Sequence, residues 1–470
     1  MGIVVRPPQV ELKNQTPYLG FVADSAMSMR LRYKGPKHLL GFGVPGALKS
    51  MGWVVPNLAT LRRSMIVIDP KGQLAAITAR RRKQFGRVIV LNPFGELLDV
   101  APHLESEGWN PALQIDAPDT PGGGAGAKAI ADAIIEKRGS ATGSSKFFDN
   151  SAENLVKALA MWERHKKGPL ASLRTVRYDL ATQNKTQFLA TLKAMAESDI
   201  QAIAIAAGRL HTRLTDDKSQ STSSQDVIDT ALSEMEFLDD PNIGADMVKG
   251  GAIPFADMHK EIITVYVVLP VVQLRAQQKW LRLLVNLALA ELFKSPPRVA
   301  TLPPVLFMLD EFGNLGRLPE ILNALNIARD YRVQLWMFLQ NLQQLRVSYE
   351  KEYTYFFAGA GAVSTFNTGD LETAEHFSKL FGNREVRMTS ESMGGGSMLT
   401  GYLHPKNVSL SQSTSTQVFP LIAPEDLRRL GVGGTANYIE PCPWPVRAEA
   451  PGYWKLFDQG ALDPNPYYHG

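Results

Sequence analysis

Residues 305–314 read Val-Leu-Phe-Met-Leu-Asp-Glu-Phe-Gly-Asn, a run of five apolar residues that ends in two adjacent carboxylates. A short apolar run of this kind predicts a strand that is covered on both faces of a sheet. Ligands of open α/β sheets bind just beyond the carboxyl ends of such strands. We therefore expect Asp310 and Glu311 to lie at a site. A strand followed by a plain acidic turn is the alternative.

The order of the two acids suggests separate roles. In nucleotide hydrolases with this layout, the first acid holds Mg²⁺, directly or through water, and a following Glu polarises the attacking water. The pattern predicts that Asp310 binds the metal and that Glu311 is catalytic.

A second motif comes early in the chain, where a short predicted strand at residues 37–41 precedes Gly-Val-Pro-Gly-Ala-Leu-Lys-Ser at 43–50. This nearly matches the phosphate loop G-x-x-x-x-G-K-[ST], in which backbone N–H groups cradle phosphate, the lysine reaches the outer phosphates and the hydroxyl binds Mg²⁺. Leu48 stands where the motif has glycine. A left-handed conformation there would cost leucine about 1–2 kcal/mol. A plain Gly-Pro loop is the alternative. The residues expected to bind nucleotide are Gly43, Gly46, Lys49 and Ser50, and Ser50 is also a predicted metal ligand.

Further apolar runs are separated by helical patterns, which predicts a mostly parallel sheet of about seven strands in an α/β nucleotide-binding core. The remaining predicted strands cover residues 64–69, 87–92, 262–269, 333–339 and 362–366. Gln340 follows one of them and is expected to sense the terminal phosphate or to position water. The basic run at residues 80–83 is interpreted as a solvated helix face, with phosphate contact as the alternative.

Composition limits the possible classes of protein. A chain of 470 residues exceeds one ordinary hydrophobic core, so two structural units are expected. The net charge of +4 is too weak to indicate a nucleic-acid partner by itself. Cys442 is the only cysteine, which excludes an internal disulfide, and the eight histidines show no ligand spacing. The longest apolar run, at 262–272, is too short to cross a bilayer.

The hydrophobic pattern of the sequence changes near residue 109, where helical periodicity replaces strand-like runs until about residue 245. We read this region as an all-α domain inserted between strands of the core. The predicted division is an irregular lead-in at 1–36, a nucleotide-binding domain at 37–108 and 246–440, the all-α domain at 109–245, and an irregular tail at 441–470. The Gly- and Ser-rich stretch at 390–417 is expected to be mobile.

Several ordered motifs together resemble one family, the TraG/TraD-like coupling proteins of type IV secretion and conjugation, which are relatives of the RecA-like FtsK translocases. The resemblance spans residues 37–430. It rests on Trp-Val-Val-Pro-Asn-Leu at 53–58, Val-Ile-Asp-Pro-Lys-Gly at 67–72, Phe-Phe-Asp at 147–149, Leu-Asp-Glu-Phe-Gly-Asn-Leu at 309–315, Leu-Gln-Asn-Leu-Gln-Gln-Leu at 339–345, Gly-Asp-Leu-Glu-Thr-Ala-Glu at 369–375 and Pro-Leu-Ile-Ala-Pro-Glu-Asp-Leu at 420–427.

The resemblance implies a RecA-like P-loop domain with an all-α domain, working as a homo-hexameric ATPase with ATP and Mg²⁺ on the cytoplasmic side of the bacterial inner membrane. Its implied partners are relaxase-DNA complexes or effector proteins, the other type IV secretion ATPases and the channel subunits. By position, Arg329 matches the family arginine that reaches the nucleotide of the neighbouring subunit, a head-to-tail arrangement that can close into a ring.

The sequence departs from the family pattern at Leu48 and at Gln73, which replaces an acid that commonly follows Asp-Pro-Lys-Gly. The family's N-terminal membrane anchor has no counterpart, so we expect a shortened chain or a variant that binds a separate membrane partner. Three functions stay open. They are an ATP-driven motor or gate of DNA or protein export, a cargo-receptor platform with impaired hydrolysis because of Leu48, and a double-stranded DNA pump without secretion. The helical insertion counts against the last.

Overall fold

The computed structural model describes residues 16–22, 29–136, 143–215, 221–294, 301–394 and 409–467. In these residues the main sheet has 11 strands in the order β2-β1-β13-β12-β9-β3-β8-β7-β4-β6-β5. All neighbouring pairs from β9 to β5 are parallel, and this run contains the seven strands expected from the sequence. These parallel strands are β3 (His38–Phe42), β4 (Met65–Asp69), β5 (Arg87–Leu91), β6 (Ile263–Val268), β7 (Val305–Leu309), β8 (Val333–Leu339) and β9 (Ala360–Thr365).

The parallel strands are buried on both faces, which explains their continuous apolar sequences. In β4, Ile66 and Ile68 face one hydrophobic cluster, whereas Met65 and Val67 face the other. One face is covered by α1 (Val55–Thr60) and α2 (Gln73–Lys83). The other face packs against α11 (Gln278–Lys294), α12 (Pro319–Ile327), α13 (Leu342–Tyr349), α14 (Tyr353–Gly359) and α15 (Leu371–Phe381).

Four strands extend the sheet in antiparallel pairing beyond β9, and the sequence analysis missed them. They are β12 (Gly434–Ile439), β13 (Val446–Glu449), β1 (Tyr18–Val22) and β2 (Arg30–Arg32). The predictions of an irregular lead-in and an irregular tail are therefore wrong for β1, β2 and β13. These strands are too short to show a period, and β1 pairs with β13 across most of the chain. Residues 1–15, 23–28 and 468–470 lie outside the described residues.

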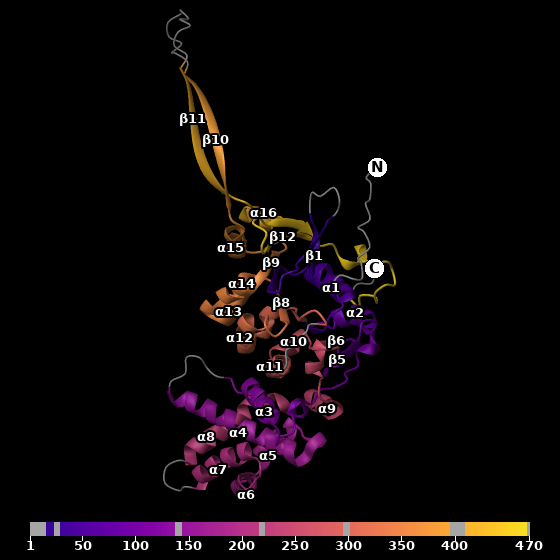
Figure 1. Cartoon of the computed structure of the whole chain (residues 1–470), viewed down its shortest axis with the longest axis vertical. Helices are drawn as coiled ribbons and strands as arrows, with labels where there is room; N and C mark the ends of the chain where they lie inside the picture. Colours follow the sequence, from indigo (N-terminus) through magenta and orange to yellow (C-terminus); the bar gives the residue numbers. More distant parts are fainter. Residues whose placement is uncertain are drawn as a thin grey trace, which may run out of the picture.

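A long hairpin stands out from the body, formed by β10 (Asn383–Gly394) and β11 (Ser409–Pro420) (Figure 1). The stretch expected to be mobile thus supplies the outer part of both strands, whereas residues 395–408 lie outside the described residues. The two short helices α10 (Val271–Leu274) and α16 (Pro424–Arg428) complete the core. In the part of the chain that the structure describes, no helix is long and apolar enough to cross a membrane.

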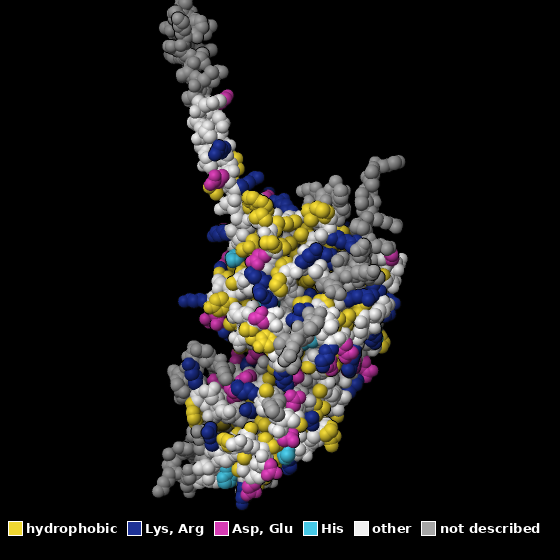
Figure 2. All heavy atoms as spheres, viewed as in Figure 1, with side chains coloured by type: hydrophobic (Ala, Val, Ile, Leu, Met, Phe, Trp, Pro, Cys, Tyr) yellow, Lys and Arg dark blue, Asp and Glu magenta, His cyan; other side chains and the backbone are white. Residues whose placement is uncertain are grey.

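The region after β5 is helical, as predicted, and forms the end of the molecule opposite the hairpin (Figure 1). Its exact limits as a domain stay a prediction. On the face drawn in Figure 2, Lys and Arg side chains are interspersed with Asp and Glu over both ends of the body. The helices are α3 (Pro121–Ile134), α4 (Gly143–Lys167), α5 (Leu173–Thr182), α6 (Lys185–Ala196), α7 (Gln201–Thr215), α8 (Ser221–Glu234) and α9 (Pro241–Lys249).

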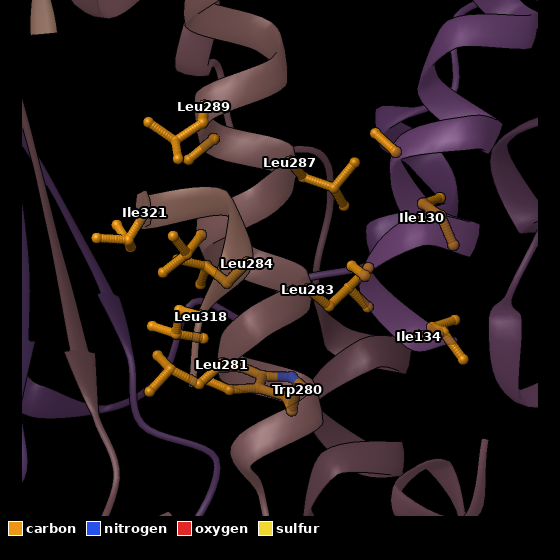
Figure 3. Close-up of a cluster of buried hydrophobic side chains, with 14 of the residues drawn as sticks. Ile130, Ile134, Trp280, Leu281, Leu283, Leu284, Leu287, Leu289, Leu318 and Ile321 are labelled. Carbon is orange, nitrogen blue, oxygen red and sulfur yellow. The ribbon is translucent and has the colours of Figure 1, made fainter. Parts of the chain in front are cut away.

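Helix α11 joins the helical region to the sheet. Leu283 and Leu287 point toward Ile130 and Ile134 of α3, whereas Leu281 and Leu284 point toward Leu318 and Ile321 at the start of α12 (Figure 3). Polar contacts support the same interface, since Arg282 donates to the carbonyl oxygen of Asp132 at 2.7 Å. A helix that is apolar on both sides thereby ties the insertion to the core.

The basic run at 80–83 is only partly the solvated face that was expected. Arg80 and Lys83 are exposed, but Arg82 is fully buried. Its guanidinium donates to the carbonyl oxygens of Leu58, Leu61 and Arg63 and to the Thr264 hydroxyl. The helical period turns this one position of the run toward the sheet, where it satisfies the backbone that follows α1.

We predict that Arg82→Ala lowers the free energy of unfolding by about 3 kcal/mol or more, because it leaves several buried carbonyl oxygens without a donor. Urea denaturation of the purified chain measures this. Lys83→Ala is the matched control, and it should change stability by less than about 0.5 kcal/mol. Equal losses in the two variants would contradict the structural role of Arg82.

Candidate functional site

The phosphate loop lies between the end of β3 and a short helix that runs from Lys49 to Val54 and continues into α1. Gly46 has a φ of +79° and Leu48 a φ of 70°. Leu48 therefore adopts the left-handed conformation for which the motif uses glycine. Only glycine visits this region freely, so the conformation costs about 1–2 kcal/mol for leucine. The loop keeps its turn despite the substitution.

Lys49 is buried under its own loop, with 7% of its surface exposed. Its ammonium donates to the carbonyl oxygens of Gly43 and Val44. Burial lowers the pKa of Lys49, and the nearby carboxylates of Glu311 and Asp310 oppose that shift. The lysine thus lies between the loop backbone and the acidic pair, as the predicted phosphate ligand requires.

Ser50 and Asp310 meet across the sheet. The Ser50 hydroxyl donates to Oδ2 of Asp310 at 2.9 Å. Burial raises the pKa of Asp310, the neighbouring charge of Glu311 raises it further, and the Ser50 hydrogen bond opposes both effects. A hydroxyl and a carboxylate oxygen side by side are the hard oxygen ligands that Mg²⁺ prefers, so this pair fits the predicted metal.

Glu311 and Gln340 also come together. The Gln340 side-chain amide donates to Oε2 of Glu311 at 2.9 Å, and Asn314 approaches the same oxygen at 3.4 Å. Strand β8 lies between β3 and β7, so Gln340 follows the strand that separates the phosphate loop from the acidic pair. Glu311 itself is left-handed, with a φ of 52°. These contacts hold the Glu311 carboxylate at the carboxyl edge of the sheet, on the side of the phosphate loop.

Arg329 is the one predicted residue that this chain does not bring to the site. It precedes β8, whereas Gln340 follows that strand of 7 residues, so the two lie about 20 Å apart along the sheet. The side chain is 59% exposed, and the Asp330 carboxylate lies 3.9 Å away. Arg329 lines a hollow of about 330 Å³ together with His38 and Tyr355 at the amino edge of the sheet.

The sequence analysis assigned no role to Asp69, which the structure places beside Asp310. The parallel register pairs Ile68 with Leu309, so the next residue of each strand lies at the same edge. Asp69 is fully buried, and this burial raises its pKa to about 7, with a further contribution from Asp310. Its position was readable in the sequence, since it ends an apolar strand in the same way as Asp310.

The comparison with known families agrees with this geometry. Residues 10–456 match the family model for type IV secretory system conjugative DNA transfer. The chain belongs to this family. The family resemblance stated from the motifs is thereby confirmed.

Curated relatives of this family member are distant. The conjugal transfer protein TraG of Escherichia coli is 24% identical over 420 residues, which cover 85% of this chain and 63% of the relative. The protein VirD4 of Agrobacterium fabrum is 25% identical over 394 residues, which cover 84% of this chain and 55% of the relative. The chain thus spans little more than half of the length of these two relatives.

Solved structures show the same fold. The plasmid coupling protein TrwB in complex with the ATP analogue ADPNP has a TM-score of 0.64 at 14% identity, covering 97% of this chain and 99% of that one. TrwB in complex with ADP and Mg²⁺ has a TM-score of 0.63 at 15% identity, covering 91% and 88%. The predicted RecA-like α/β core with a helical insertion is therefore confirmed for this family member.

We predict that the left-handed backbone at position 48 makes Leu48→Gly more stable than Leu48→Ala by about 1 kcal/mol, although both variants lose the leucine side chain. Urea denaturation of the two variants measures the difference. The same pair of substitutions at Leu170 is the control, because that side chain is 82% exposed and its φ is not positive. There alanine should be at least as stable as glycine. An alanine variant at position 48 that matches the glycine variant would show that the loop relaxes instead.

Proposed function

We propose that this chain binds and hydrolyses Mg-ATP and uses the energy to drive or gate the transfer of DNA-protein complexes or effector proteins in a type IV secretion or conjugation system. The hydrogen bond between Ser50 and Asp310 carries the proposal, because it joins the phosphate loop to the acidic strand through two oxygen ligands suited to Mg²⁺.

Nucleotide binding is supported by the local geometry and by the relatives. Gly43, Gly46, Lys49 and Ser50 form one loop at the start of a helix, where backbone N–H groups attract phosphate. TrwB, which shares this fold, has been solved with ADP and Mg²⁺ and with an ATP analogue. In this chain Ser50 and Asp310 would hold the ion, which would neutralise charge on the phosphates.

Hydrolysis requires a group that orients water toward the terminal phosphate. Glu311 is suited to this role because its carboxylate is held by Gln340 and Asn314 at the edge facing the loop. Gln340 lies between the loop and Glu311, so its amide can bind either the terminal phosphate or the attacking water. The pairing of the two side chains would link phosphate binding to the position of the base.

The exposed Arg329 suits a role in a neighbouring subunit. Head-to-tail packing of identical subunits would bring the amino edge of one sheet to the carboxyl edge of the next, and such heterologous contacts close into rings. We propose a homo-hexamer at the cytoplasmic side of the inner membrane, with relaxase-DNA complexes or effectors, other secretion ATPases and channel subunits as partners. The family description, conjugative DNA transfer, supports DNA as part of the cargo.

A second function remains in view because of the phosphate loop. The Lys49 ammonium is engaged by the carbonyl oxygens of Gly43 and Val44, which opposes its transfer to a phosphate, and Leu48 places a side chain where the motif has none. In that case the chain would act as a cargo-receptor platform that hydrolyses ATP weakly. The two functions differ in their response to Leu48→Gly.

We predict Mg²⁺-dependent ATP hydrolysis by the purified chain that rises with single- or double-stranded DNA. Lys49→Ala should abolish it, and Glu311→Gln should lower it about 100-fold or more while nucleotide still binds, because only the base is lost. The measurement is steady-state turnover over a range of protein concentrations, since assembly can limit the rate. Glu425→Gln, an exposed glutamate on α16, is the control. If Leu48→Gly hydrolyses ATP and the wild-type chain does not, the result favours the receptor platform. A Glu311→Gln variant with the turnover of the wild-type chain would contradict the role of Glu311.

We predict that Arg329→Ala also loses hydrolysis, and that mixing it with Glu311→Gln restores part of the activity. Each variant supplies the residue that the other lacks if Arg329 acts on the neighbouring subunit. Lys351→Ala, another exposed cation of the core, should retain the wild-type rate. Two inactive variants that stay inactive when mixed in all ratios would argue against action between subunits.

A further inference from the structure

The turn after β4 brings a second lysine to the carboxyl edge of the sheet. Lys71 follows Asp69 by two residues, and Asp69 lies beside Asp310 in the parallel register. The sequence analysis used Lys71 only as part of a family motif. The family comparison, the fold and the proposed roles of the other residues leave its side chain unexplained.

The backbone of this turn is held from both sides. Within the turn, Oδ2 of Asp69 accepts a hydrogen bond from the backbone N–H of Ala75 at 2.8 Å, and the N–H of Gly72 donates to the carbonyl oxygen of Asp69 at 3.2 Å. From the C-terminal part of the chain, the Tyr467 hydroxyl donates a hydrogen bond to the carbonyl oxygen of Lys71 at 2.9 Å. The position from which the Lys71 side chain starts is therefore fixed.

The same turn is tied to the helix that follows the phosphate loop. Asn465 accepts a hydrogen bond from the Gln73 side chain at 2.7 Å, and its own amide lies 3.6 Å from the sulfur of Met51, the residue after Ser50. The departure at Gln73 is thereby accounted for, because its amide donates to this bridge. The turn and the phosphate loop are neighbours on one edge.

The Lys71 side chain itself is exposed, and within the described ranges no carboxylate lies within 4 Å of its ammonium. The Asn465 bridge puts the turn of Lys71 beside the helix that begins at Lys49, so both lysines lie on one edge of the sheet, where an anion can bind between them. A phosphate group is such an anion, and it would gain a charge-assisted hydrogen bond from each.

We propose that Lys71 is a second phosphate-binding cation of this site and that it contacts the terminal phosphate of bound ATP. The inference rests on the proposed function. The strand order supports the terminal phosphate: β3, which carries the loop, is followed by β8, β7 and β4, so Lys71 lies beyond Asp310 as seen from the loop. On this order, the outer end of a phosphate chain held by the loop would be the part directed toward Lys71.

The test compares the affinities of two fluorescent nucleotides in the presence of Mg²⁺, a non-hydrolysable ATP analogue and ADP. Lys71→Ala should bind the triphosphate analogue about tenfold more weakly, the loss expected for one charged hydrogen bond, and should bind ADP within about twofold of wild type. Lys71→Arg should retain most of the affinity for the analogue. Lys83→Ala is the matched control, because this lysine is exposed at the far end of α2, the helix that follows the turn of Lys71.

The outcomes separate this inference from the proposed function. Binding of neither nucleotide by the wild-type chain would overturn both. Wild-type binding together with an unchanged Lys71→Ala variant would overturn the role of Lys71 alone. Equal losses for ADP and for the analogue would overturn the assignment to the terminal phosphate. Thermal unfolding of each variant checks that the turn is intact, and an unchanged melting temperature with a selective loss of triphosphate binding supports the proposal.

Discussion

Burial of the parallel strands on both faces determines where this protein can place its charged groups. Strands β4, β7 and β8 are mostly apolar because nearly every residue meets one of two hydrophobic clusters. The buried exception inside them is Gln334 of β8, which is hydrogen-bonded to Arg63 and to the carbonyl oxygen of Lys37. An unpaired charge in such a strand would lose its hydration without compensation. The polar residues therefore follow the last apolar residue, and the parallel direction collects Asp69, Asp310 and Gln340 at one edge.

The phosphate loop shows how this scaffold tolerates a locally unfavourable residue. Leu48 keeps the left-handed turn of the motif, although glycine would adopt it without strain. The flanking β3 and the helix from Lys49 to Val54 are buried and fix the path of the chain on both sides. Strain of this size persists where surrounding structure determines the backbone. Because this strain is present without nucleotide, it lowers the stability of the fold, while the turn that the motif needs is kept.

The helical insertion and the sheet share one continuous interface through α11. Its two apolar sides contact α3 and α12, so a displacement of the insertion would be transmitted to the helices that precede β8. Arg329 and Gln340 stand at the two ends of this strand. The arrangement would connect the helical end, if cargo binds there as proposed, to the nucleotide site.

The seven parallel strands, the helical insertion and most of the residues at the carboxyl edge could be predicted from the residue pattern. Each of these rests on a local pattern, namely a buried apolar run or a phosphate-loop spacing. Other features became visible only in the folded chain. Strand β1 pairs with β13 across nearly the whole chain, Arg82 turns inward from an apparently solvated run, and the turn that carries Lys71 lies beside the helix that follows the phosphate loop. The physical reason is that each of these features depends on contacts between distant segments, which leave no period or motif in the sequence around them.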